Sequence, residues 1–402
     1  MGTQNFFSCL ATGDFNNDKK LDIAAATQGG NIWMLLGNGN GTFALPVIVG
    51  KGGTTIVPEQ VGSTSNLDLV ALQTESPAGL TILLGDGTGH FPIHNTYNAT
   101  TDYVYYPPIS VRDLNGDGHP DIEVLGGSDK TRAISILMNN GDGTFTPGNI
   151  YNGDGATISV TPVGILAADV NGDKKVDLAF GNGAGGISVL LGNGNGTFQG
   201  NVAYATGGFG ILVGDYVGTV NPDLILPGFN SAYGLMVGKG DGTFTVETTA
   251  CGLSPQANLA SGVFTSSGEL DLAGATSVSG VPVISTCLGN GDGAFTEAGN
   301  SDQGVSHGFV APGDFNHDGK LDLVASDENG FSILFGNGDG TFQNGIPTAV
   351  TGTYENFAVG DFNNDGKLDV AVATTLGVQV YLGKGDGTFE APWSPPALRS
   401  DF

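Results

Sequence analysis

The 402-residue sequence predicts an all-β protein, a β-propeller of four-stranded antiparallel blades. Two repeated motifs carry this prediction: an acidic loop such as GDFNNDGKLD at residues 360–369, and a glycine-rich turn such as GKGDGTF at residues 383–389. Around them the apolar residues alternate or form short β-rich runs, and no helical period of 3.6 residues is present. Each repeat therefore reads as four short strands, which we label A to D from the inside outward.

The glycine-rich turn occurs eight times and always closes on a phenylalanine. These residues are Phe43, Phe91, Phe145, Phe198, Phe244, Phe295, Phe342 and Phe389. A unit of about fifty residues is too small to bury a core alone, so one domain, 1–402, is predicted. Its units span approximately 6–49, 53–99, 104–152, 158–205, 209–250, 256–298, 306–350 and 354–395. Because the chain opens on an A strand and ends after a D strand, we expect eight blades; seven blades plus one unit outside the ring is the alternative.

The acidic loop is intact in five units, at residues 13–22, 112–121, 168–177, 313–322 and 360–369. Counted from its first aspartate, each has Asp at positions 1, 5 and 9 and Asn at position 3. So many oxygens at fixed spacing favour a hard cation, and calcium also takes a backbone carbonyl at position 7. The alternative, an acidic turn without metal, explains one Asp or Asn but not four oxygens five times over.

About five calcium ions are therefore predicted. The predicted ligands are Asp14, Asn16, Asp18, Lys20, Asp22, Asp113, Asn115, Asp117, His119, Asp121, Asp169, Asn171, Asp173, Lys175, Asp177, Asp314, Asn316, Asp318, Lys320, Asp322, Asp361, Asn363, Asp365, Lys367 and Asp369. At position 6 three loops have glycine, while Lys19 and Lys174 stand in the other two and require a strained or left-handed backbone. Units 2, 5 and 6 have lost most of these acids.

Net charge and the lengths of the apolar runs argue against two classes of partner, nucleic acids and membranes. The net charge is −27 and the 13 Lys and Arg residues form no basic patch, which argues against a nucleic-acid partner. No apolar run reaches the roughly 20 residues of a membrane helix, so membrane insertion is not expected. Calcium loops of this kind favour a secreted or cell-surface location. Residues 1–10 lack the pattern of a secretory signal, so this location is inferred from calcium chemistry.

The cysteines and glycine-rich turns have plain interpretations. Cys9, Cys251 and Cys287 match no metal spacing; we interpret them as buried or idle thiols, with one disulfide as the less favoured alternative. The glycine-rich turns could cradle a phosphate, but no helix follows them to hold the anion. We therefore expect tight turns whose phenylalanine packs between blades.

Tyrosines near the crossovers between units are the candidate ligand surface. They are Tyr97, Tyr103, Tyr105, Tyr106, Tyr151, Tyr204, Tyr233 and Tyr354. Aromatic rings can stack on sugars or anchor a protein contact. The alternative is that they cover the blades and pack the crossovers. No catalytic residue is predicted, because the histidines are dispersed and no catalytic motif is present.

The alternation of DxNxDGxxD with GxGDGTF resembles the FG-GAP/VCBS repeat family, which includes the integrin α-subunit head propellers. Some bacterial secreted proteins and fungal lectins carry similar repeats. The resemblance covers nearly the whole chain, although units 2, 5 and 6 depart from the acidic pattern. It implies calcium on one face, and ligands on the opposite face or between blades.

Together these observations predict an extracellular, calcium-binding adhesion or binding module for carbohydrate or a surface protein. A structural or self-assembling surface component is the first alternative. An enzyme acting on extracellular polysaccharide is the second.

Overall fold

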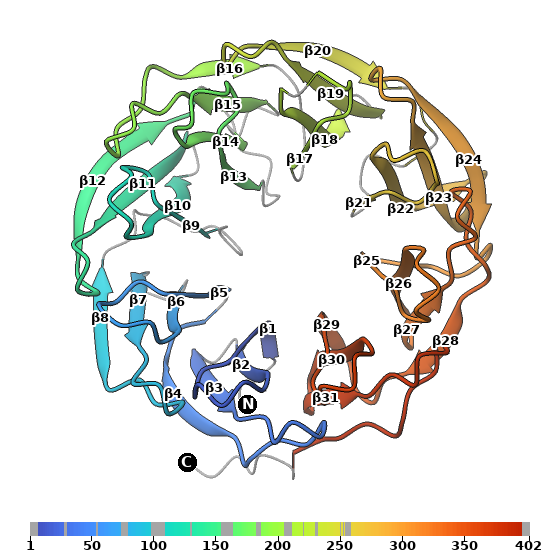
Figure 1. Ribbon diagram of the computed structural model, residues 1–402, viewed down its shortest axis with the longest axis horizontal. Coiled ribbons are helices and arrows are strands. Elements are labelled where there is room, and N and C mark those ends of the chain that lie inside the picture. Colours follow the sequence, from blue (N-terminus) through green and yellow to red (C-terminus); the bar gives the residue numbers. More distant parts are fainter. Residues whose placement is uncertain are drawn as a thin grey trace.

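The computed structural model contains eight antiparallel sheets arranged as blades around a central axis, with the first strand of each blade innermost (Figure 1). It describes residues 7–27, 30–53, 55–73, 79–97, 109–128, 131–153, 164–181, 186–204, 211–219, 221–229, 232–249, 251, 253 and 259–395. Each blade uses one continuous stretch of chain, and strands that follow one another are neighbours in the sheet. The predicted eight-bladed propeller is confirmed, and the seven-bladed alternative is wrong.

The strands of each blade run in sequence order from the axis to the rim. Blades 1 and 2 contain β1 (Phe7–Gly13), β2 (Asp22–Thr27), β3 (Asn31–Leu35), β4 (Val47–Lys51), β5 (Thr55–Glu59), β6 (Asp68–Gln73), β7 (Gly79–Leu84) and β8 (Ile93–Tyr97). Blades 3 and 4 contain β9 (Ile109–Arg112), β10 (Asp121–Ser128), β11 (Thr131–Asn139), β12 (Phe145–Asn152), β13 (Ile165–Ala168), β14 (Asp177–Gly181), β15 (Ile187–Leu190) and β16 (Val202–Tyr204).

The second half of the ring follows the same order. Blades 5 and 6 contain β17 (Leu212–Gly214), β18 (Asp223–Phe229), β19 (Ala232–Gly238), β20 (Phe244–Thr249), β21 (Leu259–Gly262), β22 (Asp271–Val278), β23 (Val281–Gly289) and β24 (Phe295–Ser301). Blades 7 and 8 contain β25 (Val310–Gly313), β26 (Asp322–Asp327), β27 (Gly330–Leu334), β28 (Ile346–Ala349), β29 (Tyr354–Gly360), β30 (Asp369–Thr374) and β31 (Gly377–Tyr381). Among the residues described, no helix is long and apolar enough to cross a membrane.

Blade 8 differs from the others at its outer edge. Its sheet has three strands, and the segment predicted as the fourth makes only two isolated bridges, Gly383 to Phe389 and Val380 to Trp393. The segment still covers the blade, because Trp393 and Val380 exchange both backbone hydrogen bonds at 2.9 Å.

The apolar core lies between blades. Strand β2 is buried on both faces: Ala24 and Ala26 pack toward blade 2, whereas Ile23 and Ala25 pack toward blade 8. A continuous apolar run is what a strand covered on both sides requires. The ring closes by the same packing, since blades 1 and 8 share one apolar cluster and exchange no strand.

The glycine-rich turns fit against the preceding blade. Gly41 has a φ of 76°, and a Cβ atom there would lie 2.3 Å from the Cδ1 atom of Leu382 in blade 8. Phe43 closes the same turn and packs edge-on against Phe362, with ring centroids 6.1 Å apart. The predicted tight turn with an inter-blade phenylalanine is therefore confirmed.

A disulfide corrects the interpretation of the cysteines. Cys251, in the connection after blade 5, is bonded to Cys287 in β23 of blade 6. Cys287 is fully buried in the apolar cluster between these blades, while Cys9 is a free thiol. The two bonded cysteines are 36 residues apart, and only the propeller geometry brings the connection against the C strand of the next blade.

One carboxyl group is buried in the core of blade 3, where Ser110, the backbone of the residue itself and Arg112 oppose the effect of burial on its pKa. Glu123 in β10 is fully buried, and neither of its carboxylate oxygens has a hydrogen-bond partner in the described part of the chain. Burial raises the pKa of Glu123 to about 8. The corresponding residues of the other blades are apolar: Ala24, Val70, Ala179, Ile225, Ala273, Val324 and Ala371.

Replacing Glu123 by valine should stabilise the protein. A carboxyl whose pKa is higher in the folded chain binds its proton more tightly there, so its contribution to stability falls as pH rises from its ordinary pKa toward about 8. We expect Glu123→Val to raise the free energy of unfolding by roughly 2–4 kcal/mol at pH 8, and by less at pH 5. Melting temperatures of both proteins at the two pH values test this. An equal rise in melting temperature at both pH values would show that the destabilisation by Glu123 does not depend on its ionisation.

Candidate functional site

The five intact acidic loops share one backbone conformation. Positions 4 and 6 have positive φ in each: Asn17 and Lys19, Gly116 and Gly118, Gly172 and Lys174, His317 and Gly319, and Asn364 and Gly366. The left-handed backbone predicted for the two lysines is confirmed, at 65° and 68°. The positive φ at position 4 was not predicted from the sequence. Glycine, asparagine or histidine stands there, and these residues tolerate the left-handed region.

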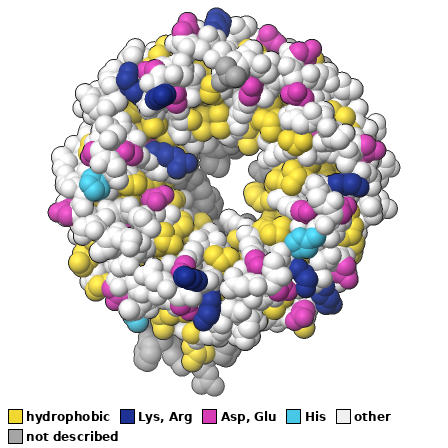
Figure 2. Space-filling view, viewed as in Figure 1, with side chains coloured by type: hydrophobic (Ala, Val, Ile, Leu, Met, Phe, Trp, Pro, Cys, Tyr) yellow, Lys and Arg dark blue, Asp and Glu magenta, His cyan; other side chains and the backbone are white. Residues whose placement is uncertain are grey.

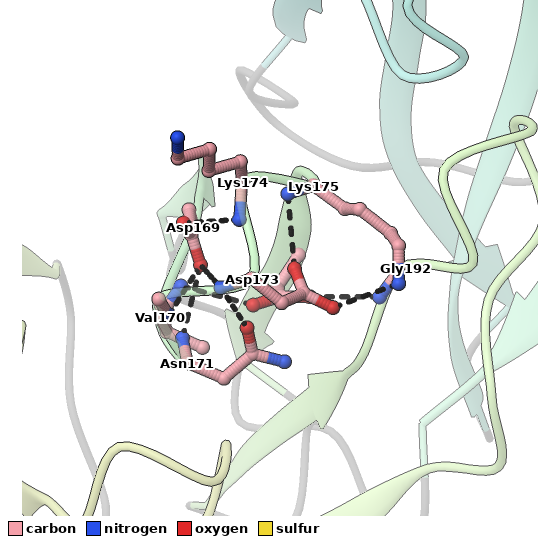
Figure 3. Close-up of polar contacts among 9 residues, drawn as sticks. Asp169, Val170, Asn171, Asp173, Lys174, Lys175 and Gly192 are labelled. Atoms are coloured by element: carbon pink, nitrogen blue, oxygen red, sulfur yellow. Dashed lines mark hydrogen bonds and ion pairs between the residues drawn. The ribbon is translucent and has the colours of Figure 1, made fainter.

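Within each loop the polar side chains bind the loop's own amides, as Figure 3 shows for unit 4. Asp169 accepts hydrogen bonds from the N–H groups of Gly172 at 2.7 Å and Lys174 at 2.8 Å. Asn171 Oδ1 accepts from the N–H of Asp173 at 2.9 Å. Asp173 in turn accepts from the N–H and the Nζ of Lys175, both at 2.9 Å. These contacts preorganise the loop.

The donor set of these loops fits a hard cation. The oxygens of Asp14 accept one N–H each, so this carboxylate keeps further lone pairs for an ion. Asp314 Oδ1, at position 1 of the loop in unit 7, is buried and has no hydrogen-bond partner among the described residues. The same residues contain no group of three or more His, Cys, Asp or Glu side chains gathered as a metal site. The loops therefore offer the ligands that calcium prefers, held in a hydrogen-bonded arrangement, and calcium binding stays a prediction.

The aspartate at position 9 has a structural role in every blade. The eight residues are Asp22, Asp68, Asp121, Asp177, Asp223, Asp271, Asp322 and Asp369, all 0–1% exposed. One oxygen accepts the N–H of the apolar residue at position 2, and the other accepts an N–H at the start of the glycine-rich turn, at 2.7–3.0 Å. Each aspartate thus joins the acidic loop, between strands A and B, to the glycine-rich turn, between strands C and D, so both lie on the same face of the ring.

This bridge explains why units 2, 5 and 6 keep only part of the motif. Asp68, Asp223 and Asp271 remain at position 9 although the ligand set around them is lost. Because the aspartate at position 9 is present in all eight units, the sequence alone could have shown that its role differs from that of positions 1, 3 and 5. Burial raises the pKa of Asp22 to about 6, and the Gly37 and Phe15 amides oppose that rise.

Lysines at position 7 pair with the aspartate at position 5. The Nζ–Oδ2 distance is 3.1 Å for Lys20 and Asp18, and 2.9 Å for Lys175 and Asp173. Such exposed pairs contribute little to stability. Figure 2 shows acidic side chains spaced around the ring, with Lys, Arg or His beside several of them.

Three of the candidate tyrosines are held between blades. The hydroxyls of Tyr97, Tyr151 and Tyr204 accept the N–H groups of Phe145, Phe198 and Phe244 in the next blade, at 2.8, 2.9 and 3.0 Å. The same pairs of rings pack edge-on, with centroids 5.7, 5.4 and 5.9 Å apart. These contacts correspond to the alternative, packing interpretation of the tyrosines.

The other candidate tyrosines give no ligand surface of their own. The Tyr354 hydroxyl donates to the backbone carbonyl of Asp327 in blade 7. Tyr103, Tyr105 and Tyr106 lie outside the described residues, as does the side chain of Tyr233. A ligand role for the tyrosines stays a prediction.

A pocket of about 400 Å³ with both polar and apolar lining lies between blades 6 and 7, where the sequence predicted no site. Its lining, which defines the blade 6–7 pocket, is Pro282, Asp302, Gly304, Val305, Ser306, Asp327, Glu328, Asn329, Ser332, Gly345, Pro347, Thr348 and Ala349. The pocket lies at the end of β26 opposite Asp322, and therefore away from the acidic-loop face. Its volume falls in the range of small-ligand sites.

Asp302 in the wall of this pocket is backed by a buried histidine, His307. His307 Nε2 lies 2.8 Å from Asp302 Oδ2, and His307 Nδ1 lies 3.2 Å from the carbonyl oxygen of Ser326. Asp302 Oδ1 accepts the N–H of Gly345 at 3.0 Å, which ties blade 6 to blade 7. Asp302 and His307 lie in the crossover between two units, outside both repeated motifs. The repeat pattern therefore did not predict a site there.

The comparisons with known proteins agree with this architecture. The sequence model of the FG-GAP-like repeat matches residues 14–59, 113–180, 314–372 and 361–401, just over half of the chain. The chain belongs to this family. The matched regions contain all five intact acidic loops, and units 2, 5 and 6 lie largely outside them. No curated protein sequence matches this FG-GAP-like chain.

Solved structures share its fold at low sequence identity. An Agrocybe aegerita lectin, described by its specific recognition of non-reducing terminal N-acetylglucosamine, is 18% identical with a TM-score of 0.53, covering 86% of this chain and 94% of the lectin. The exotype rhamnogalacturonan lyase YesX is 13% identical with a TM-score of 0.51, covering 80% and 70%. BBS1N in complex with ARL6DN is 10% identical with a TM-score of 0.50, covering 96% and 94%. At these identities the likeness shows the fold alone.

Asp68→Asn tests the structural role of position 9 without involving a predicted calcium site. Asp68 accepts the N–H groups of Val61, Gly62 and Gly85, and an amide nitrogen in its place would face a donor. We expect the free energy of unfolding to fall by about 2–4 kcal/mol, equally in calcium and in EDTA. Urea unfolding in both buffers measures it.

The matched control is Asp142→Asn, in the exposed turn of blade 3, where units 1 and 4 naturally carry Asn40 and Asn195. It removes the same charge and should leave the unfolding midpoint unchanged. A loss confined to the calcium buffer would contradict the structural role of Asp68.

Proposed function

We propose that this FG-GAP-like propeller is an extracellular, calcium-binding module that binds carbohydrate. The observation that carries the proposal is the blade 6–7 pocket. It is concave, it lies away from the acidic-loop face, and carboxylate, hydroxyl and amide groups line it beside proline and valine surfaces. Such a lining can accept and donate hydrogen bonds to sugar hydroxyls while apolar groups cover the face of the ring.

One feature supports calcium binding and another supports an extracellular location. The acidic loops offer only oxygen ligands in a conformation shared five times, with a buried unpaired oxygen in one of them. The Cys251–Cys287 disulfide suits an oxidising compartment such as the cell exterior. Bound calcium would neutralise part of the charge of −27 and hold each A–B loop in place.

The similar folds include a lectin and a polysaccharide lyase, and this makes a carbohydrate the first ligand class to test. For this chain the proposed activity is binding. His307 lies behind the pocket wall with its side chain fully buried, and both of its ring nitrogens are engaged, by Asp302 and by the carbonyl oxygen of Ser326.

A protein partner is the second candidate. Outer strands of blades 1 to 3 expose apolar side chains, among them Ile48, Ile93 and Ile150, each more than half exposed. Apolar groups along a rim can support contact with a surface protein or with another copy of the chain. Concentration-dependent assembly would favour this second candidate.

Removing calcium should lower the melting temperature. If five sites bind calcium only in the folded state, each adds about 2–3 kcal/mol at a hundredfold excess over its dissociation constant. Calorimetric titration should count about five ions, and Asp365→Asn should remove one of them. Asp215→Asn, in a unit without the ligand set, is the matched control and should leave the count unchanged. A melting temperature unaffected by EDTA at moderate salt would rule out the calcium role.

A glycan array tests carbohydrate binding, with calcium and with EDTA in parallel. We expect saturable binding in calcium that Thr348→Trp abolishes, because a large side chain at Thr348 fills the pocket. Thr296→Trp, on the exposed side of β24, is the control and should bind as the parent does. A blank array with correctly folded protein would transfer support to the protein partner.

A further inference from the structure

The lining of the blade 6–7 pocket has a marked imbalance of charge. Asp302, Asp327 and Glu328 contribute three carboxyl groups, and no lysine or arginine is among the lining residues. His307 contacts Asp302 from behind the wall, with its side chain fully buried. The pocket therefore presents acceptors and negative charge to whatever enters it.

Two of these carboxylates are fixed in position. Asp302 is only 7% exposed and is held by His307 and by the Gly345 amide. Asp327 accepts the N–H of Asn329 and the hydroxyl of Ser332, each at 2.9 Å. Each carboxylate keeps lone pairs beyond these bonds. Because Asp302 is largely removed from water, a cation beside it gains more than at an open surface.

The rest of the lining matches a hydroxylated ring. Ser306, Asn329 and Thr348 can donate to or accept from hydroxyl groups. Pro282, Val305 and Pro347 offer apolar surface for the C–H face of a sugar. A neutral sugar would use the hydroxyl contacts but leave Asp327 and Glu328 without a counter-charge among the described residues. An acidic sugar would be repelled, both by the pocket and by the net charge of the chain.

We propose that the blade 6–7 pocket selects a sugar that carries a free, protonated amino group, with the ammonium facing Asp302, Asp327 and Glu328. The inference rests on the proposed function and adds the charge of the ligand to it. The pocket would then bind a glucosamine-type residue more tightly than an N-acetylated sugar or an acidic sugar.

Calorimetric titration of the full chain in calcium, at a pH that keeps the amine protonated, measures this selectivity. The probes are a tetramer of β-1,4-linked glucosamine, the matching N-acetylglucosamine tetramer, a tetragalacturonate and spermidine. We expect the glucosamine tetramer to bind at least about tenfold more tightly than the N-acetylated tetramer at low salt, with the advantage shrinking as salt rises. Tetragalacturonate and spermidine should bind more weakly than either.

Two charge-removing variants place the selectivity in the pocket. Glu328→Gln should weaken glucosamine-tetramer binding about three- to tenfold, and Asp327→Asn by at least as much, with little change for the N-acetylated tetramer. Glu297→Gln removes an exposed charge from β24 of blade 6 outside the pocket and should change neither affinity. Unchanged melting temperatures confirm that each variant is folded.

The outcomes separate this inference from the proposed function. Equal affinity for the two tetramers overturns the charge selectivity and leaves carbohydrate binding intact. Spermidine binding as tightly as the glucosamine tetramer, or glucosamine binding that neither pocket variant weakens, reduces the effect to adsorption on an acidic surface and overturns the inference. Absence of binding by every sugar overturns both.

Discussion

In each blade a buried aspartate holds the loop that leaves the innermost strand against the turn that enters the outermost one. Its two oxygens each accept a backbone N–H, so two loops far apart in the sequence of the unit are fixed by one side chain. A carboxylate removed from water is costly unless donors surround it, and here the loops themselves supply those donors. The positions of the acidic loop and of the turn glycines relative to each other follow from this bridge.

The seams between blades depend on the same arrangement. Once the turn is fixed, its second glycine meets the preceding blade and its phenylalanine enters the apolar seam, as Gly41 and Phe43 do against blade 8. Every B strand is covered on both faces, so no blade completes its core without its neighbours. Blades 5 and 6 both lack the intact acidic loop, and a disulfide joins them across their seam. A covalent link there restricts the unfolded chain.

The repeat made much of this fold predictable. Strands and glycine-rich turns recur in all eight units and the intact acidic loop in five, so the copies reinforce one another. Features that occur once were missed, because periodicity carries no information about them. Glu123 stands where seven units have apolar residues, and Cys251 meets Cys287 only through the packing of one connection. The tyrosines were assigned to a surface because the sequence does not show that their hydroxyls reach amides of the next blade.

The seam between blades 6 and 7 shows how a departure from the repeat can create a site. In three other seams a tyrosine hydroxyl accepts the N–H of the next blade's phenylalanine; here the short Ser301 accepts from Phe342 at 3.0 Å. Ser301 brings the end of β24 close to blade 7, and the following residue, Asp302, reaches the Gly345 amide and His307. The seam thereby exchanges an aromatic contact for a polar one beside an open pocket. The contacts that tie blade 6 to blade 7 are therefore the same ones that hold the Asp302 carboxylate in the pocket wall.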